Sequence, residues 1–423
     1  MKKSTYLALC ASTLLYAEAP AVKPLSQRTF SQSQFIPDIS LIVDTSFAYR
    51  NKDQDGLGGL SIPGVVEDFF GQGETDGHEH TGYSSDNGFN INYAELVLSS
   101  NVDPSFRLDS VFHFGLDSVE IEELYFTNTT LIDGLRIRGG KILSNFTRFN
   151  SQHQHFWDFN EVPLVYKGFL GSEKLNELGL QFQYTLPLEE YVILGLEVSQ
   201  GDNEKSFGND TLTLSNAQEI KGADAPSLLV TYIKTSFDIG DTTIVPGFSY
   251  IHGQSRSLDA HDGHEVAFDG TSSLYNIELT LKHYFDSYSF LSWQSEWMRL
   301  EKKGDEYHLE NNVLEVHDQK IEQEGYYSQL VYAHDQNLRV GVRYDSIYKN
   351  TYDFSEEALP PAPYKRYSAM GEYHFSEFSR LRLEYTHNSA LFKEGVNGFE
   401  AENVDSVILS LNLAIGAHGA HDF

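Results

Sequence analysis

The C-terminal stretch VILSLNLAIG, residues 407–416, indicates the fold of this chain more clearly than any other segment. Its apolar residues fall on every second position from Val407 to Ile415, with polar residues such as Ser410 between them. Because successive side chains of a strand point to opposite faces, one face of this segment is apolar and the other is polar. Phe423, the last residue, shares the parity of the apolar face. This pattern is typical of the closing strand of a transmembrane β-barrel, whose outward face meets lipid.

The N-terminus has the features of an exported protein. Two lysines precede an apolar run from Tyr6 to Ala17, and this run is too short to span a bilayer. The small residues at its end predict a secretory signal peptide over residues 1–19, with cleavage between positions 17 and 21. We therefore expect a short periplasmic segment over residues 20–38 and a barrel over residues 39–423.

Composition narrows the class of protein. The mean hydropathy is −0.37 and no long apolar run follows the signal peptide, which excludes a helical membrane protein. A barrel hides its apolar residues in alternation, and the 25 Tyr and 28 Phe suit aromatic girdles at the two membrane interfaces. The single cysteine, Cys10, lies in the signal peptide, so the mature chain offers neither disulfides nor thiolate metal ligands.

The period-two pattern recurs along the chain and predicts about 16 strands of an all-β, antiparallel transmembrane barrel. An even number of strands suits closure of a single-chain barrel. The predicted strands are residues 39–50, 89–101, 105–115, 118–128, 135–142, 177–186, 191–200, 228–238, 242–253, 274–285, 288–299, 325–334, 337–346, 365–375, 380–387 and 404–417. The parity changes midway through 89–101, 118–128 and 228–238, which predicts a β-bulge in each of these three strands.

Short and long connections alternate between the predicted strands. Short turns such as Asp286-Ser287 and Asp335-Gln336 would face the periplasm, and every long loop then falls on the outer side. A barrel of sixteen strands is the size of a porin and encloses an aqueous lumen, whereas plugged receptors use about 22 strands. The chain has no room for a plug domain, so passive diffusion is the expected mode of transport.

Charged residues of both signs fall on the inward positions of the predicted strands. The predicted pore-lining residues are Arg107, Asp109, His113, Glu278, Lys282, Arg339, Arg343, Glu372, Arg382 and Glu384. Their mixed sign excludes a one-sided basic ladder of the kind that selects phosphate.

Acidic residues outnumber basic ones by 61 to 30, and many of the acids lie in the predicted loops. An acidic mouth concentrates cations, which predicts a channel that favours them. The alternative is that the acidic loops only keep the surface hydrated and bind the divalent ions that bridge lipopolysaccharide.

Histidines accompany carboxylates in three of the predicted outer loops. Neutral imidazole together with carboxylate is a common ligand set for Zn²⁺ or Cu²⁺. The candidate metal ligands are His78, His80, His153, His155, Asp158, His261 and His264. Either the three loops converge on one mouth and hold a divalent ion, or each pair is an incidental feature of a polar loop. No cofactor is required in either case.

Residues 143–175 form a connection that could narrow the pore. They include Arg148, His153, Trp157 and Glu161, a set of side chains that suits a constriction. The connection either folds into the lumen, as long third loops of general porins do, or packs on the rim as an ordinary external loop.

Several segments together resemble one family of outer-membrane proteins. The stretch NSQHQHFWDFNEVPLVY, residues 150–166, is the most specific of them. The others are FNINYAELVLSSNVDPSF (89–106), VEIEELYF (119–126), PDISLIVD (37–44) and the ending IGAHGAHDF. Over most of its length the chain is similar to proteobacterial zinc-regulated outer-membrane receptors and, more distantly, to phosphate-selective O/P-type porins. The resemblance implies outer-membrane transport, possible Zn²⁺ binding or transport, and a role for His153, His155, Trp157 and Asp158 on the matching motif.

These observations predict a porin-like channel in the outer membrane of a Gram-negative bacterium, for passive uptake of small solutes and for zinc (divalent metal) acquisition. The expected partners are outer-membrane lipid and lipopolysaccharide, the barrel assembly machinery through Phe423, and small solutes or divalent ions. A homotrimer is one assembly open to such a barrel, and no nucleic acid is expected. Two alternative functions remain open. One is a surface-binding protein, either an adhesin or a metal sensor or receptor, and the other, less favoured, is an outer-membrane enzyme. The chain has no Gly-x-Ser-x-Gly motif, which argues against an enzyme of that type.

Overall fold

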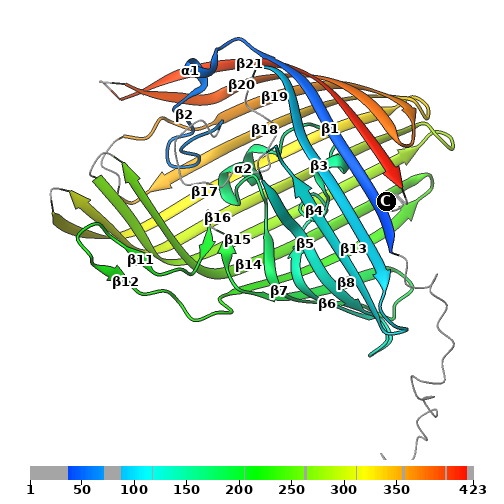
Figure 1. Ribbon diagram of the computed structural model, residues 1–423, viewed down its shortest axis with the longest axis horizontal. Coiled ribbons are helices and arrows are strands. Elements are labelled where there is room, and N and C mark those ends of the chain that lie inside the picture. Colours follow the sequence, from blue (N-terminus) through cyan, green and yellow to red (C-terminus); the bar gives the residue numbers. More distant parts are fainter. Residues whose placement is uncertain are drawn as a thin grey trace, which may run out of the picture. The chain divides into compact units, whose positions relative to one another are not determined.

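The computed structural model of this protein describes residues 37–70, 87–116, 118–203, 205–261, 264–310, 312–354, 358–395 and 398–416. Within these residues it is an all-β, closed antiparallel barrel, which confirms the predicted fold (Figure 1). The predictions made for residues 1–36, His78, His80 and Phe423 lie outside the described residues. None of the helices in the described part of the chain is long and apolar enough to cross a membrane.

All sixteen predicted strands are present. Where a strand adjoins a short turn, its observed boundary lies within a few residues of the predicted one. The barrel strands are β1 (Asp38–Arg50), β3 (Gly88–Asn101), β4 (Phe106–Phe114), β5 (Val119–Asn128), β6 (Leu135–Leu143), β7 (Asn176–Thr185), β8 (Tyr191–Ser199), β13 (Leu228–Ile239), β14 (Thr242–His261), β15 (His264–Tyr284), β16 (Phe290–Glu310), β17 (Val313–Ala333), β18 (Leu338–Tyr352), β19 (Tyr364–Ser376), β20 (Ser379–Gly395) and β21 (Gly398–Gly416). The short strands are β2 (Leu60–Ser61), which pairs with β20, and the pairs β9 (Asp202–Asn203) with β10 (Phe207–Gly208) and β11 (Leu212–Thr213) with β12 (Glu219–Ile220).

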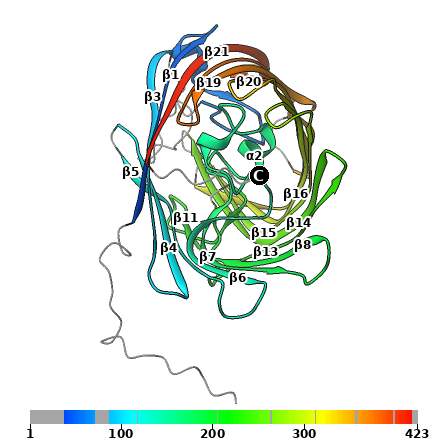
Figure 2. The same cartoon turned by 90° about the vertical axis from the view of Figure 1, so that its right-hand side faces the viewer.

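The first and last barrel strands pair with each other and close the barrel. β1 runs antiparallel to β21 from Ser40 opposite Gly416 to Arg50 opposite Ser406, and its other edge pairs with β3. Closure pairs the first strand with the last, which removes the open edge that a sheet surrounded by lipid cannot have. The ring of strands is seen in Figure 2.

The alternation predicted for the last strand holds in its described part. Val407, Leu413 and Ile415 are exposed on the outer face of β21, whereas Ser406 and Ser410 are buried on the inner face. Aromatic residues also gather on the outer face of neighbouring strands. The rings of Tyr326, Tyr344 and Tyr367, on β17, β18 and β19, form a row with centroids 5.8 and 5.1 Å apart. Such a row is what an aromatic girdle at a membrane interface looks like.

Two of the three predicted β-bulges are confirmed. The register between β1 and β3 shifts after Asp44, and the register between β4 and β5 shifts after Val111. The third prediction, in β13, is wrong, because β13 pairs with β8 without a shift. Leu228, Val230 and Tyr232 are buried on the inner face of β13, against an apolar core inside the barrel. Both faces of this strand therefore carry apolar residues near its start, and the backbone pairing continues without a shift.

Four strands extend far beyond their predicted ends. β14 to β17 are 20 or 21 residues long, so the loops expected between residues 253 and 274 and between 299 and 325 are instead paired strands. The β14–β15 ladder continues to His261 opposite His264. About 9–11 residues suffice to cross a bilayer, so these hairpins project beyond the membrane. There no lipid imposes apolar alternation, and the sequence pattern gives no sign of the strand.

Two connections fold into the barrel and build a hydrophobic core there. One, residues 53–70, contains α1 (Gln54–Leu57) and β2, and the other contains the 3₁₀ helix η3 (Gln154–Phe156) and α2 (Leu164–Phe169). Apolar side chains from both connections are fully buried together with Tyr327 and other inward residues of the wall. Figure 2 shows α2 inside the ring of strands.

Candidate functional site

Residues 144–175, here called the lumen loop, lie inside the barrel. The loop connects β6 to β7, yet the backbone N–H of Leu164 donates to Asp345 of β18 at 2.9 Å. β18 lies half-way round the barrel from β6, so the loop crosses the lumen. Asn160 reaches a further strand, β20, where its N–H donates to Glu384 at 2.8 Å. Of the two placements expected for this connection, the structure confirms the one inside the lumen.

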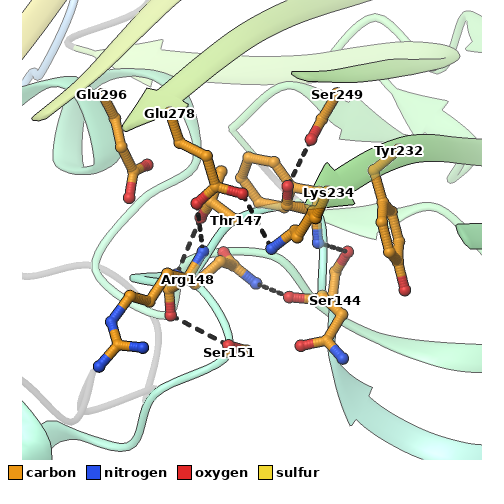
Figure 3. Close-up of polar contacts among 12 residues, drawn as sticks. Ser144, Thr147, Arg148, Ser151, Tyr232, Lys234, Ser249, Glu278 and Glu296 are labelled. Carbon is orange, nitrogen blue, oxygen red and sulfur yellow. Dashed lines mark hydrogen bonds and ion pairs between the residues drawn. The ribbon is translucent and has the colours of Figure 1, made fainter. Parts of the chain in front are cut away.

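Carboxylates on the inner wall hold the start of the lumen loop (Figure 3). The N–H of Asn145 donates to Glu197 at 2.9 Å, and the N–H of Arg148 donates to Glu278 at 2.7 Å. Glu278 also pairs with Lys234 at 3.0 Å. A buried backbone N–H must find a partner, and a carboxylate is a stronger acceptor than a neutral group. Glu197, Glu278, Asp345 and Glu384 are called the wall carboxylates below.

Arginines of β18 to β20 hold the other half of the loop. Arg382 donates to the carbonyl of Trp157 at 2.6 Å and pairs with Glu372 at 2.6 Å. Arg343 donates to the carbonyl of Glu161 at 2.9 Å. Because carbonyl groups of the loop accept from wall arginines while its N–H groups donate to wall carboxylates, both signs of inward charge are used to fix one segment.

This arrangement changes the role of several predicted pore-lining residues. Six of the ten are buried next to the lumen loop, namely His113, Glu278, Arg343, Glu372, Arg382 and Glu384. The other four keep some exposure, namely Arg107, Asp109, Lys282 and Arg339. All ten predicted pore-lining residues fall on inward positions of the strands. Alternation alone does not show which of these inward side chains the lumen loop covers.

A cluster of histidines and glutamates lies where the lumen loop meets β3, β4 and β5. Glu122 Oε2 lies 2.8 Å from His113 Nε2 and 2.9 Å from His153 Nδ1. Glu95 Oε2 lies 3.3 Å from His113 Nε2 and 3.1 Å from His155 Nδ1. Two histidines of the loop and one of the wall therefore alternate with two glutamates of the wall. These five residues are called the His–Glu cluster.

The β-bulge in β5 builds one side of this cluster. Glu122 is the extra residue at the register shift, so it and Glu123 both reach the same imidazole instead of pointing to opposite faces. His153 contacts Glu122 through Nδ1 and Glu123 through Nε2, each at 2.9 Å. Glu123 also accepts the N–H of Leu143 at 2.8 Å, which ties the bulge to the entry of the lumen loop.

Burial makes the charges of the cluster strongly dependent on one another. Glu95 has no exposed surface and its Oε1 makes no hydrogen bond to any described residue. Burial by itself lowers the pKa of His153, but the carboxylates of Glu122 and Glu95 outweigh it and hold the pKa of this imidazole well above its usual value. Carboxylate and imidazole groups at these spacings can bind a proton or a metal ion.

The predicted metal ligands do not all meet. His153 and His155 stand together in the cluster, with ring centroids 5.9 Å apart. Asp158, three residues on, instead accepts from Gln329 of β17 at 2.9 Å, and burial raises the pKa of its carboxyl group. His261 and His264 occupy opposite backbone positions at the end of the β14–β15 ladder. His78 and His80 lie outside the described residues.

Glu95 is a site residue that sequence reasoning missed. Glu95 lies in the predicted strand 89–101. The alternation in this strand changes parity midway, so it does not show which residues point inward. Arg366 was missed as well, although it is completely buried among acidic groups. Its cross-strand neighbour is Asp345, a pairing that becomes visible only when the register of β18 against β19 is known.

Comparison with known proteins supports the fold and shows one relative. No protein-family model matches the chain. The chain is similar to the outer-membrane channel DcaP of Acinetobacter baumannii, with 12% identity, a TM-score of 0.53, and coverage of 91% of this chain and 99% of that one. It is also similar to Salmonella typhi OmpF, solved in complex with daunomycin, with 10% identity, a TM-score of 0.50, and coverage of 91% and 99%. At such identities the likeness shows the fold alone.

A closer relative occurs in Aquifex aeolicus (strain VF5). This uncharacterized protein is 38% identical over 397 residues, which cover 93% of this chain and 81% of the relative. The resemblance to zinc-regulated outer-membrane receptors and O/P-type porins is not confirmed by these comparisons and stays a prediction. The chain thus has the barrel fold of outer-membrane porins and belongs to the same family as the Aquifex aeolicus protein.

Proposed function

We propose that this protein is a porin-type channel in the outer membrane of a Gram-negative bacterium, which admits small solutes by passive diffusion, favours cations and serves in the acquisition of divalent metal ions such as Zn²⁺. The observation that carries the proposal is a closed barrel with a polar, charged inner face and a loop folded across its lumen. A barrel of this size has room for an aqueous path, and a loop inside it narrows that path.

The charge of the chain supports the preference for cations. Acidic residues exceed basic ones by 31 (61 minus 30), and a surplus of one sign raises the local concentration of the opposite ions. The internal ion pairs support it less, because wall arginines and wall carboxylates largely neutralise each other beside the loop. The selectivity should therefore arise mainly from the acidic surplus outside these internal ion pairs.

Single-channel current in a planar lipid bilayer tests this function. The purified full chain should insert in steps of uniform conductance, and under a KCl gradient the reversal potential should have the sign of a cation-selective pore. A reversal potential near zero would reject the cation preference but keep the channel. A folded protein that gives no steps would reject the channel and favour a surface-binding protein.

Assembly provides a separate test of location. In the sequence Phe423 shares the parity of the apolar residues from Val407 to Ile415, and we expect the barrel assembly machinery to recognise it. Removing this residue should lower the amount of folded barrel in the outer-membrane fraction of the cell, whereas the change Phe423→Tyr, which keeps an aromatic end, should have little effect. Equal amounts from all three chains would contradict this recognition.

A further inference from the structure

We propose that the His–Glu cluster is a binding site for a divalent transition-metal ion such as Zn²⁺, with ligands from Glu95, His113, Glu122 and His153. The ion would join the lumen loop to the wall of the barrel. The inference deepens the proposed function by naming where a metal ion is held, and it rests on that function only for how the ion reaches the lumen.

The spacing of the ligand atoms suits such an ion. One ligand atom from each of Glu95, His113 and Glu122 can be chosen so that all lie within 4.8 Å of one another. His113 Nε2 lies 3.3 Å from Glu95 Oε2 and 2.8 Å from Glu122 Oε2. Two ligands of a tetrahedral Zn²⁺, each at about 2.0–2.1 Å, are roughly 3.3 Å apart. Shifts of less than about 1 Å would bring the three groups onto one ion.

His153 lies beside this group of three and can join it as a fourth ligand by a shift toward Glu122. Its Nδ1 lies 2.9 Å from Glu122 Oε2, next to the same oxygen that His113 contacts, and its Nε2 lies 2.9 Å from Glu123 Oε2. A metal-bound histidine usually donates its other ring N–H to a carboxylate, which fixes the tautomer and the ring. Glu123 is placed to be that acceptor.

Glu95 provides an independent reason to expect a cation. Its carboxylate is completely buried, and Oε1 has no hydrogen-bond partner among the described residues. Burying an unsatisfied charged oxygen is unfavourable, and such groups in proteins are usually paired or coordinate a metal. Oε2 already contacts His113 and His155, so an ion that is held by both oxygens of Glu95 would also satisfy Oε1.

The charge around the cluster agrees with this assignment. Glu95, Glu122 and Glu123 bring three carboxylates to a largely buried space, and a divalent cation would balance two of the three charges. A pocket lined by His113, Glu120, Glu122 and Lys174, among others, adjoins the cluster.

The ligand types indicate which ions are favoured. Imidazole and carboxylate without thiolate suit Zn²⁺, Ni²⁺ or Cu²⁺, whereas Ca²⁺ and Mg²⁺ prefer sites made of oxygen alone. We therefore expect Zn²⁺ to bind at least about 100-fold more tightly than Ca²⁺.

The test is isothermal titration calorimetry with Zn²⁺. The full chain is first folded in detergent micelles and freed of metal with a chelator. One tight site per chain is expected, and its affinity should fall by at least about 10–100-fold in His113→Ala, Glu122→Gln and His153→Ala. Glu122→Gln keeps the shape of the side chain, and heat-modifiable migration on gels shows whether each variant has folded.

Two controls make the result specific. His308→Ala removes another buried histidine that contacts a glutamate, Glu306 at 2.6 Å in the β16–β17 hairpin, and should leave the tight site unchanged. The double variant His78→Ala/His80→Ala should also leave it unchanged. Absence of tight binding, equal binding by the cluster variants, or loss of the tight site in the His78/His80 double variant would each overturn the proposal.

Bilayer conductance of the same preparations separates this inference from the proposed function. A chain that binds Zn²⁺ at the cluster but does not conduct would count against the channel alone. A chain that conducts but binds no Zn²⁺ would count against the metal site alone.

Discussion

Arg366 shows how one inward side chain secures the lumen loop. Its guanidinium group has no exposed surface, donates to Glu161 at 2.9 Å and to the carbonyl of Val162 at 2.5 Å, and lies 3.3 Å from a carboxylate oxygen of Asp345. Two of these partners belong to the loop and the third to β18. A single cation on β19 therefore joins the loop to two neighbouring strands.

Removing this cation should strongly destabilise the protein. Arg366→Met leaves Asp345 and Glu161 without their shared partner, and breaking a buried ion pair costs about 3–5 kcal/mol. Urea unfolding in detergent micelles, followed by tryptophan fluorescence, measures the change. Arg299→Met is the matched control, because Arg299 also lies near three glutamates but on the partly exposed outer face, and should cost under about 1 kcal/mol. Equal costs for the two variants would contradict this role.

Lys174 predicts a pH dependence of stability. Burial lowers the pKa of this loop lysine from 10.5 to about 8, although the carboxylates of Glu122 and Glu123 oppose the shift. Between about pH 8 and 10.5 the unfolded chain holds this proton while the folded chain has released it, so this group makes stability rise with pH in that window.

The variant Lys174→Met isolates this contribution. The stability of the parent relative to the variant should increase between pH 7.5 and 10.5, by up to about 3 kcal/mol. Urea unfolding of both chains at several pH values gives the difference, in which other titrating groups cancel. Lys303→Met, at a mainly exposed lysine, is the matched control. A flat difference for Lys174→Met would show that its proton is not involved.

At the scale of elements, the lumen loop depends on the wall carboxylates. Glu197 and Glu278 hold its start, and Asp345 and Glu384 hold its middle, each through a backbone N–H. A hydrogen bond to a charged group contributes about 1.5–3 kcal/mol. These four bonds therefore add to the burial of the loop's apolar side chains in the core inside the barrel.

Removing three of these anchors should open the lumen. The variant Glu197→Ala/Glu278→Ala/Glu384→Ala should show a larger and more variable single-channel conductance, because the loop no longer stays fixed across the barrel. The control is Glu301→Ala/Glu322→Ala/Glu324→Ala. These three glutamates lie on the outer face of β16 and β17 and pair there with Arg299 and Lys349. Unchanged conductance in the first variant would show that the loop does not limit the flow of ions.

At the scale of the whole molecule, the acidic surplus predicts a selectivity that depends on salt. Charges near the mouths are screened over about 10 Å at 0.1 M salt but only about 3 Å at 1 M. The ratio of K⁺ to Cl⁻ permeability, taken from reversal potentials, should therefore fall clearly between these concentrations. A ratio that does not change with salt would place the selectivity at a fixed site inside the lumen, where screening is weak.

The relation between sequence and structure differs along the same barrel. Strands that cross the membrane were predicted, because lipid on one side and polar groups on the other impose a period of two that each segment displays by itself. The projecting parts of β14 to β17 were not, because solvent on their outer side imposes no such pattern. In β13 the inward apolar residues, which pack on the lumen loop, gave the false impression of a bulge.

The barrel, its sixteen strands and the inward direction of most charged residues can all be predicted from the chain, because alternation is local and the bilayer enforces it. The presence of His153 and His155 near carboxylates was also visible in the chain. The folded barrel alone shows that the loop carrying these histidines crosses the lumen and that they meet Glu95, His113 and Glu122. Those contacts depend on hydrogen bonds between residues far apart in sequence, such as Asn160 and Glu384, which are 224 positions apart. No local pattern encodes such a meeting, since it results from closure and register of the whole barrel.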